Sequence, residues 1–236
     1  MDRYASEDSV LHSGLRPNLR RIFDHGEIYN RELPELFAGV ASMFAEKKEE
    51  LCDMDAKMGD GDLGLTMDKG YGALPQLIKE NTEPGDIGKT LMKAGMKMAG
   101  LVPSTMGTLM SSGVMEGGKA LKGKTEFGAE ELSVYLTAFA AGIKKRGKCE
   151  LGDRTILDSV DAGAKSAAEA AAAGKTMEEV IEAACQGAAA GVEATKDMVP
   201  KFGKAAVFAA KAAGVADQGA VAGMYMIQGL KRGICG

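Results

Sequence analysis

The 236-residue sequence contains no tryptophan, only two histidines and only four cysteines. Both histidines, His12 and His25, lie near the start, which excludes most histidine-based catalysis and histidine-ligated zinc from the body of the chain. We interpret His25 as a surface histidine rather than a carrier of phosphate. The dispersed cysteines form no Cys-x-x-Cys pair, so we expect reduced thiols that mostly fill the core of a cytoplasmic protein.

An excess of basic residues is also missing. The net charge is -4 and the isoelectric point is about 5.4, and lysine and arginine are scattered without interleaved aromatic residues. Nucleic-acid binding proteins usually show a basic footprint. No apolar run is long enough to cross a bilayer, and the first eight residues lack the basic head and apolar centre of a signal peptide. We therefore expect neither nucleic acid nor membrane as a partner.

Alternating β-branched runs are absent, whereas apolar residues recur at helical spacing through most of the chain. The pattern predicts an all-α fold, a single bundle of about eight helices. Residues 1–30 are polar and weakly periodic and are predicted to form an N-terminal extension, which leaves residues 31–236 as one helical domain.

Several helix boundaries can be predicted from local signals. Pro34 suits the first turn of a helix, Asp86 suits an N-cap, and Thr176 with Glu179 has the spacing of a capping box. Towards the end of the chain we expect an element over 191–199, a linker over 200–204 and a helix over 220–230.

Three aspartates, Asp55, Asp60 and Asp62, lie within eight residues and alternate with glycines. Carboxylates that are close together repel one another, and a hard cation among their oxygens relieves the repulsion. The spacing matches no single helical face and instead predicts one aspartate at a helix end and two on the following turn. Mg²⁺ is the expected ion, because it combines a few carboxylates with water and phosphate. A solvated turn is the alternative, and an EF-hand is excluded because Tyr71 stands where its glutamate belongs.

Two further stretches could hold phosphate. Residues 103–107 combine small and hydroxyl residues in a turn with exposed N–H groups, although an ordinary helix–helix connection is the alternative. Residues 85–90 come close to a P-loop, but Glu83 occupies the position of its first glycine and no strand precedes it.

Taken together, these turns resemble those of a known family, the nucleotide-binding L subunits of dihydroxyacetone kinases (DhaL/Dak2-like domains), over about residues 34–232. The matching motifs occur in the same order: Asp55-x-x-x-Gly59-Asp60-Gly-Asp62-x-Gly64-x-x-Met67, Pro103-Ser-Thr-Met-Gly107, Gly147-Lys148-x-x-x-Gly152-Asp153-Arg154-Thr155, Gly203-Lys204-Ala205 and Gly214-x-x-Asp217-x-Gly219.

The resemblance implies an antiparallel helical barrel with a nucleotide and metal site at one rim. It implies that Asp55, Asp60 and Asp62 hold two Mg²⁺ ions and that no other residue is catalytic. The positions that it assigns to ADP or ATP binding are Leu63, Gly64, Leu65, Thr66, Thr105, Met106, Gly107, Gly147, Ile156, Lys204, Asp217 and Gly219.

The implied activity is phosphoryl transfer to dihydroxyacetone or a related short ketose that a separate K-type subunit holds on a histidine. The phosphate donor is left open between ATP and a bound ADP that a phosphocarrier protein of the phosphoenolpyruvate relay recharges. Whether the chain forms a homodimer is also left open.

The chain departs from the family pattern at several nucleotide-facing positions. Leu63 stands in place of a histidine, residues 103–106 replace a glycine-rich loop, and Gln218 replaces a proline. Lys204 and Lys211 replace arginines and lose their bidentate geometry. The departures keep open an alternative, a catalytically weakened binding or regulatory module. A purely structural helical protein is a third hypothesis, which leaves the three aspartates unexplained.

Overall fold

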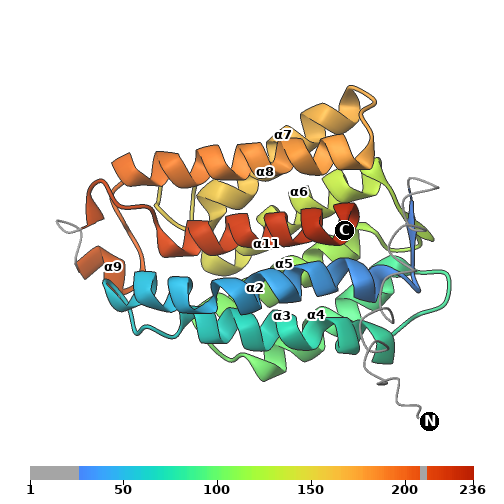
Figure 1. Ribbon diagram of the computed structural model, residues 1–236, viewed down its shortest axis with the longest axis horizontal. Coiled ribbons are helices and arrows are strands. Elements are labelled where there is room, and N and C mark those ends of the chain that lie inside the picture. The colour runs from blue at the N-terminus through green and yellow to red at the C-terminus, as the bar shows by residue number, and fades with distance from the viewer. Residues whose placement is uncertain (1–26, 208–211) are drawn as a thin grey trace, which may run out of the picture.

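The computed structural model describes residues 27–207 and 212–236, which are almost entirely helical (Figure 1). The predicted roles of His12, His25 and Lys211 therefore lie outside the described residues, as does most of the predicted extension. The long helices are α2 (Leu33–Ala56), α3 (Leu63–Glu80), α4 (Ile87–Leu101), α5 (Thr105–Ala120), α6 (Ala129–Gly147), α7 (Ile156–Ala172), α8 (Met177–Ala194) and α11 (Gln218–Cys235).

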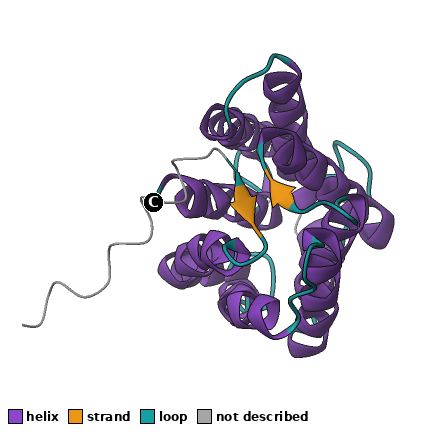
Figure 2. Ribbon diagram, turned by 90° about the vertical axis from the view of Figure 1, so that its right-hand side faces the viewer, coloured by secondary structure: helices purple, strands orange, loops and turns teal. Residues whose placement is uncertain are grey.

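The eight long helices form a closed ring. Each packs against the next along the chain from α2 to α8, α11 packs against α8, and α11 also packs against α2. Figure 2 looks along the barrel and shows this ring of helices end-on. The connections from α2 to α8 are short, and a longer segment joins α8 to α11; successive helices run antiparallel, and alternate connections lie at the same end (Figure 1). The predicted all-α, barrel-like antiparallel bundle is confirmed.

The helices begin where the sequence supplies caps. Asp86 accepts a hydrogen bond from the Lys89 N–H at the start of α4, and Thr176 with Glu179 forms the capping box of α8. Such side chains satisfy N–H groups that have no partner within the helix. Pro34 lies in the first turn of α2, where its missing N–H costs nothing.

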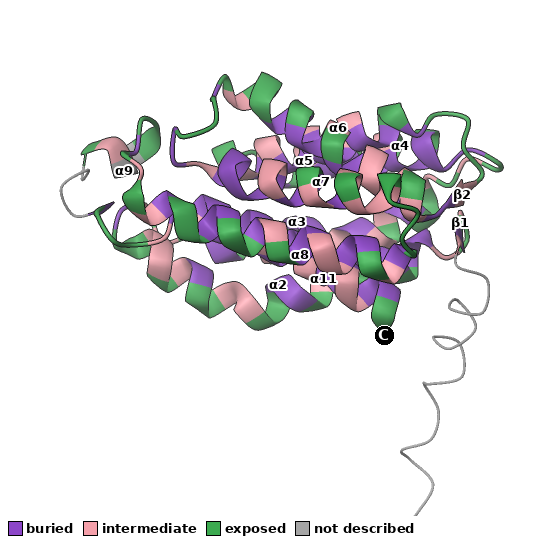
Figure 3. Ribbon diagram, turned by 90° about the horizontal axis from the view of Figure 1, so that it is seen from above, coloured by how far each residue is buried: buried purple, intermediate pink, exposed green. Residues whose placement is uncertain are grey.

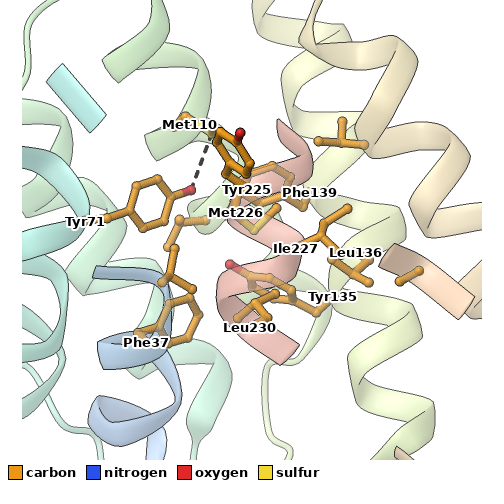
Figure 4. Packing of buried hydrophobic residues seen from close by; sticks show 14 of the residues in the cluster. Phe37, Tyr71, Met110, Tyr135, Leu136, Phe139, Tyr225, Met226, Ile227 and Leu230 are labelled. Carbon is orange, nitrogen blue, oxygen red and sulfur yellow. Dashed lines mark hydrogen bonds between the residues drawn. The ribbon is translucent and has the colours of Figure 1, made fainter. Parts of the chain in front are cut away.

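One large hydrophobic core fills the barrel. Phe37 and Phe139 pack against Tyr135, and the Tyr71 hydroxyl donates to Met110 Sδ at 3.4 Å (Figure 4). Buried and exposed segments alternate along the helices in Figure 3, as expected when one face of each helix is turned towards a common core. This core makes the barrel a rigid frame for the loops at its rim.

A small antiparallel sheet closes the end of the barrel where α2 begins. Strand β1 (Ile28–Tyr29) pairs with β2 (Glu126–Phe127), with Ile28 opposite Phe127. The helical pattern of the sequence did not predict these two-residue strands. Ile28 is buried in the core. The division of the chain at residue 30 stays a prediction.

The predicted element over 191–199 is wrong. Helix α8 continues through Ala194 and passes into a 3₁₀ turn at Thr195–Asp197. Gly191 lies inside this helix, and a Cβ there would fall 2.4 Å from the Asp158 carbonyl oxygen of α7. Gly191 therefore permits close contact between α8 and α7 instead of marking a helix start.

The segment after α8 also differs from its prediction. The linker expected over 200–204 leads into a short helix, α9 (Gly203–Val207). Helix α11 begins two residues before the predicted start at 220, because Asp217 caps it by accepting from the Ala220 N–H at 2.9 Å, and it runs on to Cys235.

Candidate functional site

A cavity of about 600 Å³ opens at the end of the barrel opposite the small sheet. Its volume is typical of a small-molecule site. Five separate segments line it, from the α2–α3 turn, the start of α5, the turn into α7, the segment before α9 and the start of α11. The lining residues are Asp55, Met58, Gly59, Asp60, Asp62, Leu63, Thr66, Pro103, Ser104, Thr105, Met106, Leu109, Arg154, Thr155, Ile156, Phe202, Gly203, Asp217, Gln218 and Gly219.

The acidic turn has the predicted layout. Asp55 lies in the last turn of α2, whereas Asp60 and Asp62 lie on the turn that leads into α3. The backbone N–H groups of Gly61 and Asp62 donate to Asp55 Oδ2 at 2.9 and 3.2 Å. Gly61 adopts a positive φ of 78°, which allows the chain to fold back over Asp55. The turn thereby holds the Asp55 carboxylate at the cavity wall.

The donor set of this turn suits a hard cation. All three carboxylates line the same cavity, and carboxylate oxygens are the ligands that Mg²⁺ prefers. Gly59 leaves room beside Asp55 Oδ1, since a Cβ there would lie 2.1 Å from that oxygen. Within residues 27–207 and 212–236, no three histidine, cysteine or acidic side chains are already arranged around a common metal position. The residues therefore fit Mg²⁺ by chemistry and location, and their role as its ligands stays a prediction.

The start of α5 forms the neighbouring wall. Ser104 caps this helix by accepting a hydrogen bond from the Gly107 N–H at 3.0 Å. Pro103, Thr105 and Met106 line the cavity on either side of the cap. The first N–H groups of a helix have no acceptor within it, so this end of α5 favours a bound anion.

A buried polar network forms the floor. The Arg154 side chain is fully buried, and Nη1 lies 3.7 Å from Asp217 Oδ1. Burial raises the pKa of Asp217 to about 6, against the opposing effects of the Ala220 N–H and the Arg154 guanidinium. The Asp217 N–H donates to the Thr195 hydroxyl at 2.9 Å. The network ties the start of α11 to the turn before α7 and to the end of α8.

A second ion pair holds the segment before α9 against the same floor. Lys201 Nζ lies 2.5 Å from Asp153 Oδ1, and the Lys201 N–H donates to the Asp153 carbonyl oxygen at 3.2 Å. The Lys201 ammonium holds the pKa of Asp153 below its ordinary value. Phe202, which follows directly, is therefore placed at the cavity wall.

Most of the predicted site residues lie at this cavity. Those that line it are Asp55, Asp60, Asp62, Leu63, Thr66, Thr105, Met106, Ile156, Asp217 and Gly219. These residues are spread from position 55 to position 219 of the sequence, and the closed ring of helices brings them to one cavity.

Five predicted nucleotide contacts are not among the lining residues. Gly64 and Gly107 are buried in backbone contacts: a Cβ would lie 1.9 Å from the Lys48 carbonyl oxygen and 2.2 Å from that of Val102, respectively. Leu65 is 57% exposed on the outer side of α3.

The other two predicted contacts are Gly147 and Lys204. Gly147 ends α6 and faces Cys149 and Leu109. The Lys204 side chain lies outside the described residues, although its backbone belongs to α9. The binding roles of all these positions stay predictions.

The prediction missed several lining residues, among them Met58, Arg154 and Phe202. Arg154 lies within a recognised motif, so its membership of that motif was the available signal. Met58 and Phe202 are single apolar residues next to turns, and no local pattern distinguishes them from core residues.

The described part of the chain contains no helix that is both long and apolar enough to cross a bilayer.

Comparisons with known proteins identify the family of this chain. A family profile described as the DAK2 domain matches residues 57–232. The chain is 32% identical over 127 residues to the ADP-binding subunit DhaL of PEP-dependent dihydroxyacetone kinase 2 from Listeria innocua; the match covers 53% of this chain and 59% of that subunit. It is 27% identical over 186 residues to the corresponding DhaL subunit of Escherichia coli, covering 79% of this chain and 88% of that subunit.

A solved structure has a similar fold. The dihydroxyacetone kinase from C. freundii, in complex with AMP-PNP and Mg²⁺, superposes with a TM-score of 0.64 at 23% sequence identity. The superposition covers 98% of this chain and 38% of that kinase.

Proposed function

The chain belongs to the DAK2 domain family, and we propose that it is the nucleotide- and Mg²⁺-binding subunit of a kinase for dihydroxyacetone or a related short ketose. It passes a phosphoryl group to a substrate that a separate K-type subunit holds. The observation that carries the proposal is the convergence of five separate segments, three aspartates among them, on one cavity.

The acidic turn is the proposed phosphate end of the cavity. Asp55, Asp60 and Asp62 would hold two Mg²⁺ ions, which when bound neutralise the charge of the phosphates. The Gly61 and Asp62 N–H groups hold the Asp55 carboxylate in position. The ligand named for the C. freundii kinase, AMP-PNP with Mg²⁺, supports this pairing of nucleotide and metal.

The starts of α3 and α5 flank the acidic turn, where Thr66 and Thr105 line the cavity. Both helix starts present N–H groups that have no intrahelical acceptor, and both helix dipoles favour negative charge. We propose that these ends orient the phosphates, so that the chain supplies positioning and charge neutralisation rather than a covalent intermediate.

The cavity lining also includes apolar residues, which we propose as contacts for the nucleoside. They are Met58, Met106, Leu109, Ile156 and Phe202. Sulfur and aromatic side chains suit the face of a purine ring. A lining that combines carboxylates with apolar residues suits the two chemically distinct halves of ADP or ATP.

A partner subunit is part of the proposal, because phosphoryl transfer needs an acceptor and the described residues contain no histidine that could hold a keto sugar. The Listeria and Escherichia relatives are named as subunits of PEP-dependent kinases, which favours a phosphocarrier protein that recharges bound ADP. Direct transfer from ATP is the other donor. ADP that co-purifies with the protein and is not displaced by added ATP would favour the phosphocarrier as donor over direct transfer from ATP.

Calorimetry with Mg²⁺-ADP tests the nucleotide site. The matched variant is Asp62→Asn, because the Asp62 side chain makes no capping hydrogen bond to α3 and the amide keeps its size. We expect the wild type to bind Mg²⁺-ADP, and we expect the variant, or an excess of EDTA, to remove most of the binding. Unchanged binding in Asp62→Asn and in EDTA would contradict the metal assignment.

A coupled assay tests the kinase role. The chain alone, supplied with Mg²⁺-ATP and dihydroxyacetone, should form no sugar phosphate, and a K-type subunit with a phosphoryl donor should restore the reaction. Relatives named as kinase subunits favour this role over a non-catalytic binding module. Binding of Mg²⁺-ADP without any transfer in the complete system would overturn the kinase role.

A further inference from the structure

Asp158 is a buried carboxylate behind the cavity wall. It lies in the first turn of α7, is 5% exposed, and is not among the residues that line the cavity. Its two oxygens accept short backbone hydrogen bonds, Oδ1 from the Gly152 N–H at 2.6 Å and Oδ2 from the Thr155 N–H at 2.7 Å. One side chain therefore holds both ends of the turn that leads into α7.

The turn that Asp158 holds has an unusual backbone. Gly152 has a φ of 87° and Arg154 a φ of 60°, so two of its residues lie in the left-handed region. For arginine this conformation is uncommon and costs free energy, so surrounding contacts must support it. The two hydrogen bonds to Asp158 give this support, because they fix the N–H groups before and after Arg154.

Two segments of the cavity wall depend directly on this turn. Thr155 and Ile156, at its end, line the cavity themselves. Asp153, inside the turn, holds Lys201 through its side chain, with Nζ 2.5 Å from Oδ1, and through its carbonyl oxygen. Phe202, the next residue, is a lining residue of the segment before α9. The position of the turn therefore sets both segments.

Arg154 connects the turn to a third segment of the wall. Its Nε donates to the Thr195 carbonyl oxygen at 3.2 Å, and its Nη2 donates to those of Ala212 and Val215 at 3.3 and 2.9 Å. Ala212 and Val215 lie shortly before α11, whose first residues line the cavity. A displacement of the turn would therefore also reach the start of α11.

We propose that Asp158 is a positioning residue for nucleotide binding, which acts on the cavity wall through the turn at 152–155 and makes no contact with the ligand. The inference rests on the function proposed above. A carboxylate that only capped α7 would add stability and leave the affinity of the folded protein unchanged. A positioning residue sets that affinity, because a ligand is held well only by walls that are already in place.

Glu179 is the matched control for Asp158. It occupies the same third position of α8, and its carboxylate accepts from the Thr176 N–H at 2.9 Å, but this helix start lies at the other end of the barrel (Figure 1). Asp158→Asn and Glu179→Gln each keep the size of the side chain and remove the charge. An amide accepts through its oxygen alone, so Asp158→Asn also loses one of the two hydrogen bonds to the turn.

Two glycines give a second matched comparison. Gly152 and Gly174 have φ of 87° and 71°, and a Cβ at either would meet no atom within 4 Å. Gly152→Ala strains the turn at 152–155 and leaves the Asp158 carboxylate in place, whereas Gly174→Ala strains the turn between α7 and α8 at the other end of the barrel. This comparison decides the question if Asp158→Asn does not fold.

The test is calorimetry with Mg²⁺-ADP at a temperature at which circular dichroism shows every variant to be folded. We expect Asp158→Asn and Gly152→Ala to bind Mg²⁺-ADP about tenfold more weakly than the wild type. Glu179→Gln and Gly174→Ala should bind it normally. All four variants should unfold at lower temperatures than the wild type, so affinity, and not stability, separates the two groups.

Wild-type affinity in both Asp158→Asn and Gly152→Ala would overturn this inference and leave the proposed function standing, because Asp158 would then be a helix cap only. The same loss of affinity in all four variants would also overturn it, because binding would then follow general stability. A wild type that binds no Mg²⁺-ADP would overturn the proposed function and this inference together.

Discussion

Arg154 and Asp217 meet beneath the cavity, with Nη1 3.7 Å from Oδ1 and both side chains almost completely buried. Arg154 adopts a φ of 60°, a left-handed conformation that is uncommon outside glycine. In this conformation the guanidinium lies between α7, the end of α8 and the start of α11, where its hydrogen bonds stabilise the turn. The pair joins two segments of the cavity wall, the turn into α7 and the start of α11.

The stability of the protein should depend on pH through Asp217. Burial raises the pKa of Asp217 to about 6 from its ordinary value of 3.8. Between these two pH values the native state holds a proton that the unfolded chain has released. The free energy of unfolding should therefore fall as the pH rises from about 4 to about 6, by about 3 kcal/mol in total, and should then level off with respect to this group.

Urea unfolding at several pH values from 4 to 8 measures this effect. The control is Asp217→Asn, which keeps an oxygen to cap α11 and cannot titrate. Subtracting its profile removes the contribution of all other groups. Parallel profiles for the wild type and the variant would show that Asp217 titrates normally.

Replacement of Arg154 by lysine should destabilise the protein although the charge is kept. A single ammonium group cannot reach the carbonyl oxygens of Thr195, Ala212 and Val215 in the geometry of the guanidinium. Buried carbonyl groups without donors should lower the free energy of unfolding by about 2–4 kcal/mol. Arg146→Lys, at an exposed position in the last turn of α6, should change it by less than about 0.5 kcal/mol. Similar values for the two variants would contradict the stabilising role of the Arg154 hydrogen bonds.

Two glycines on α3 should respond to alanine in opposite ways. A Cβ at Gly64 would lie 1.9 Å from the Lys48 carbonyl oxygen of α2, so Gly64→Ala should push the two helices apart and lower the free energy of unfolding by about 1–3 kcal/mol. Gly72 is exposed with no atom within 4 Å of such a Cβ, so Gly72→Ala should raise it by about 1 kcal/mol. Chemical denaturation of both variants gives the comparison, and destabilisation by both would refute it.

The Ser104 cap should stabilise the start of α5. Ser104→Ala removes the acceptor for the Gly107 N–H and should cost about 1 kcal/mol of unfolding free energy. Ser112 lies on the same helix, and its hydroxyl donates to the Thr108 carbonyl oxygen within the helix. Ser112→Ala should be nearly neutral, because alanine is the better helix former. Thermal unfolding of both variants checks the difference, and equal shifts would argue against the cap.

Local chemistry explains why many helix boundaries could be predicted. A cap such as Asp86 or a capping box such as Thr176 with Glu179 acts within one turn of the chain, so its signal is contained in four consecutive residues. The layout of Asp55, Asp60 and Asp62 around a helix end was predictable for the same reason.

The roles of individual glycines could not be predicted from local sequence in the same way. Gly64, Gly107 and Gly191 stand in similar surroundings in the sequence, yet in each case the space of the missing Cβ is taken by the backbone of Lys48, Val102 or Asp158. Close approach to a ligand and close approach to a neighbouring helix both require glycine, and only the contacts distinguish them.

The sequence by itself determined the helical class, most caps and the acidic turn, because periodicity and capping depend on neighbouring residues. The tertiary structure decided which distant side chains share the cavity and which glycines serve helix packing. It also placed Arg154 and Gln218 among the residues that line the cavity. These outcomes depend on closure of the helix ring, which brings residues 55 and 219 to one rim and depends on contacts between segments far apart in the chain.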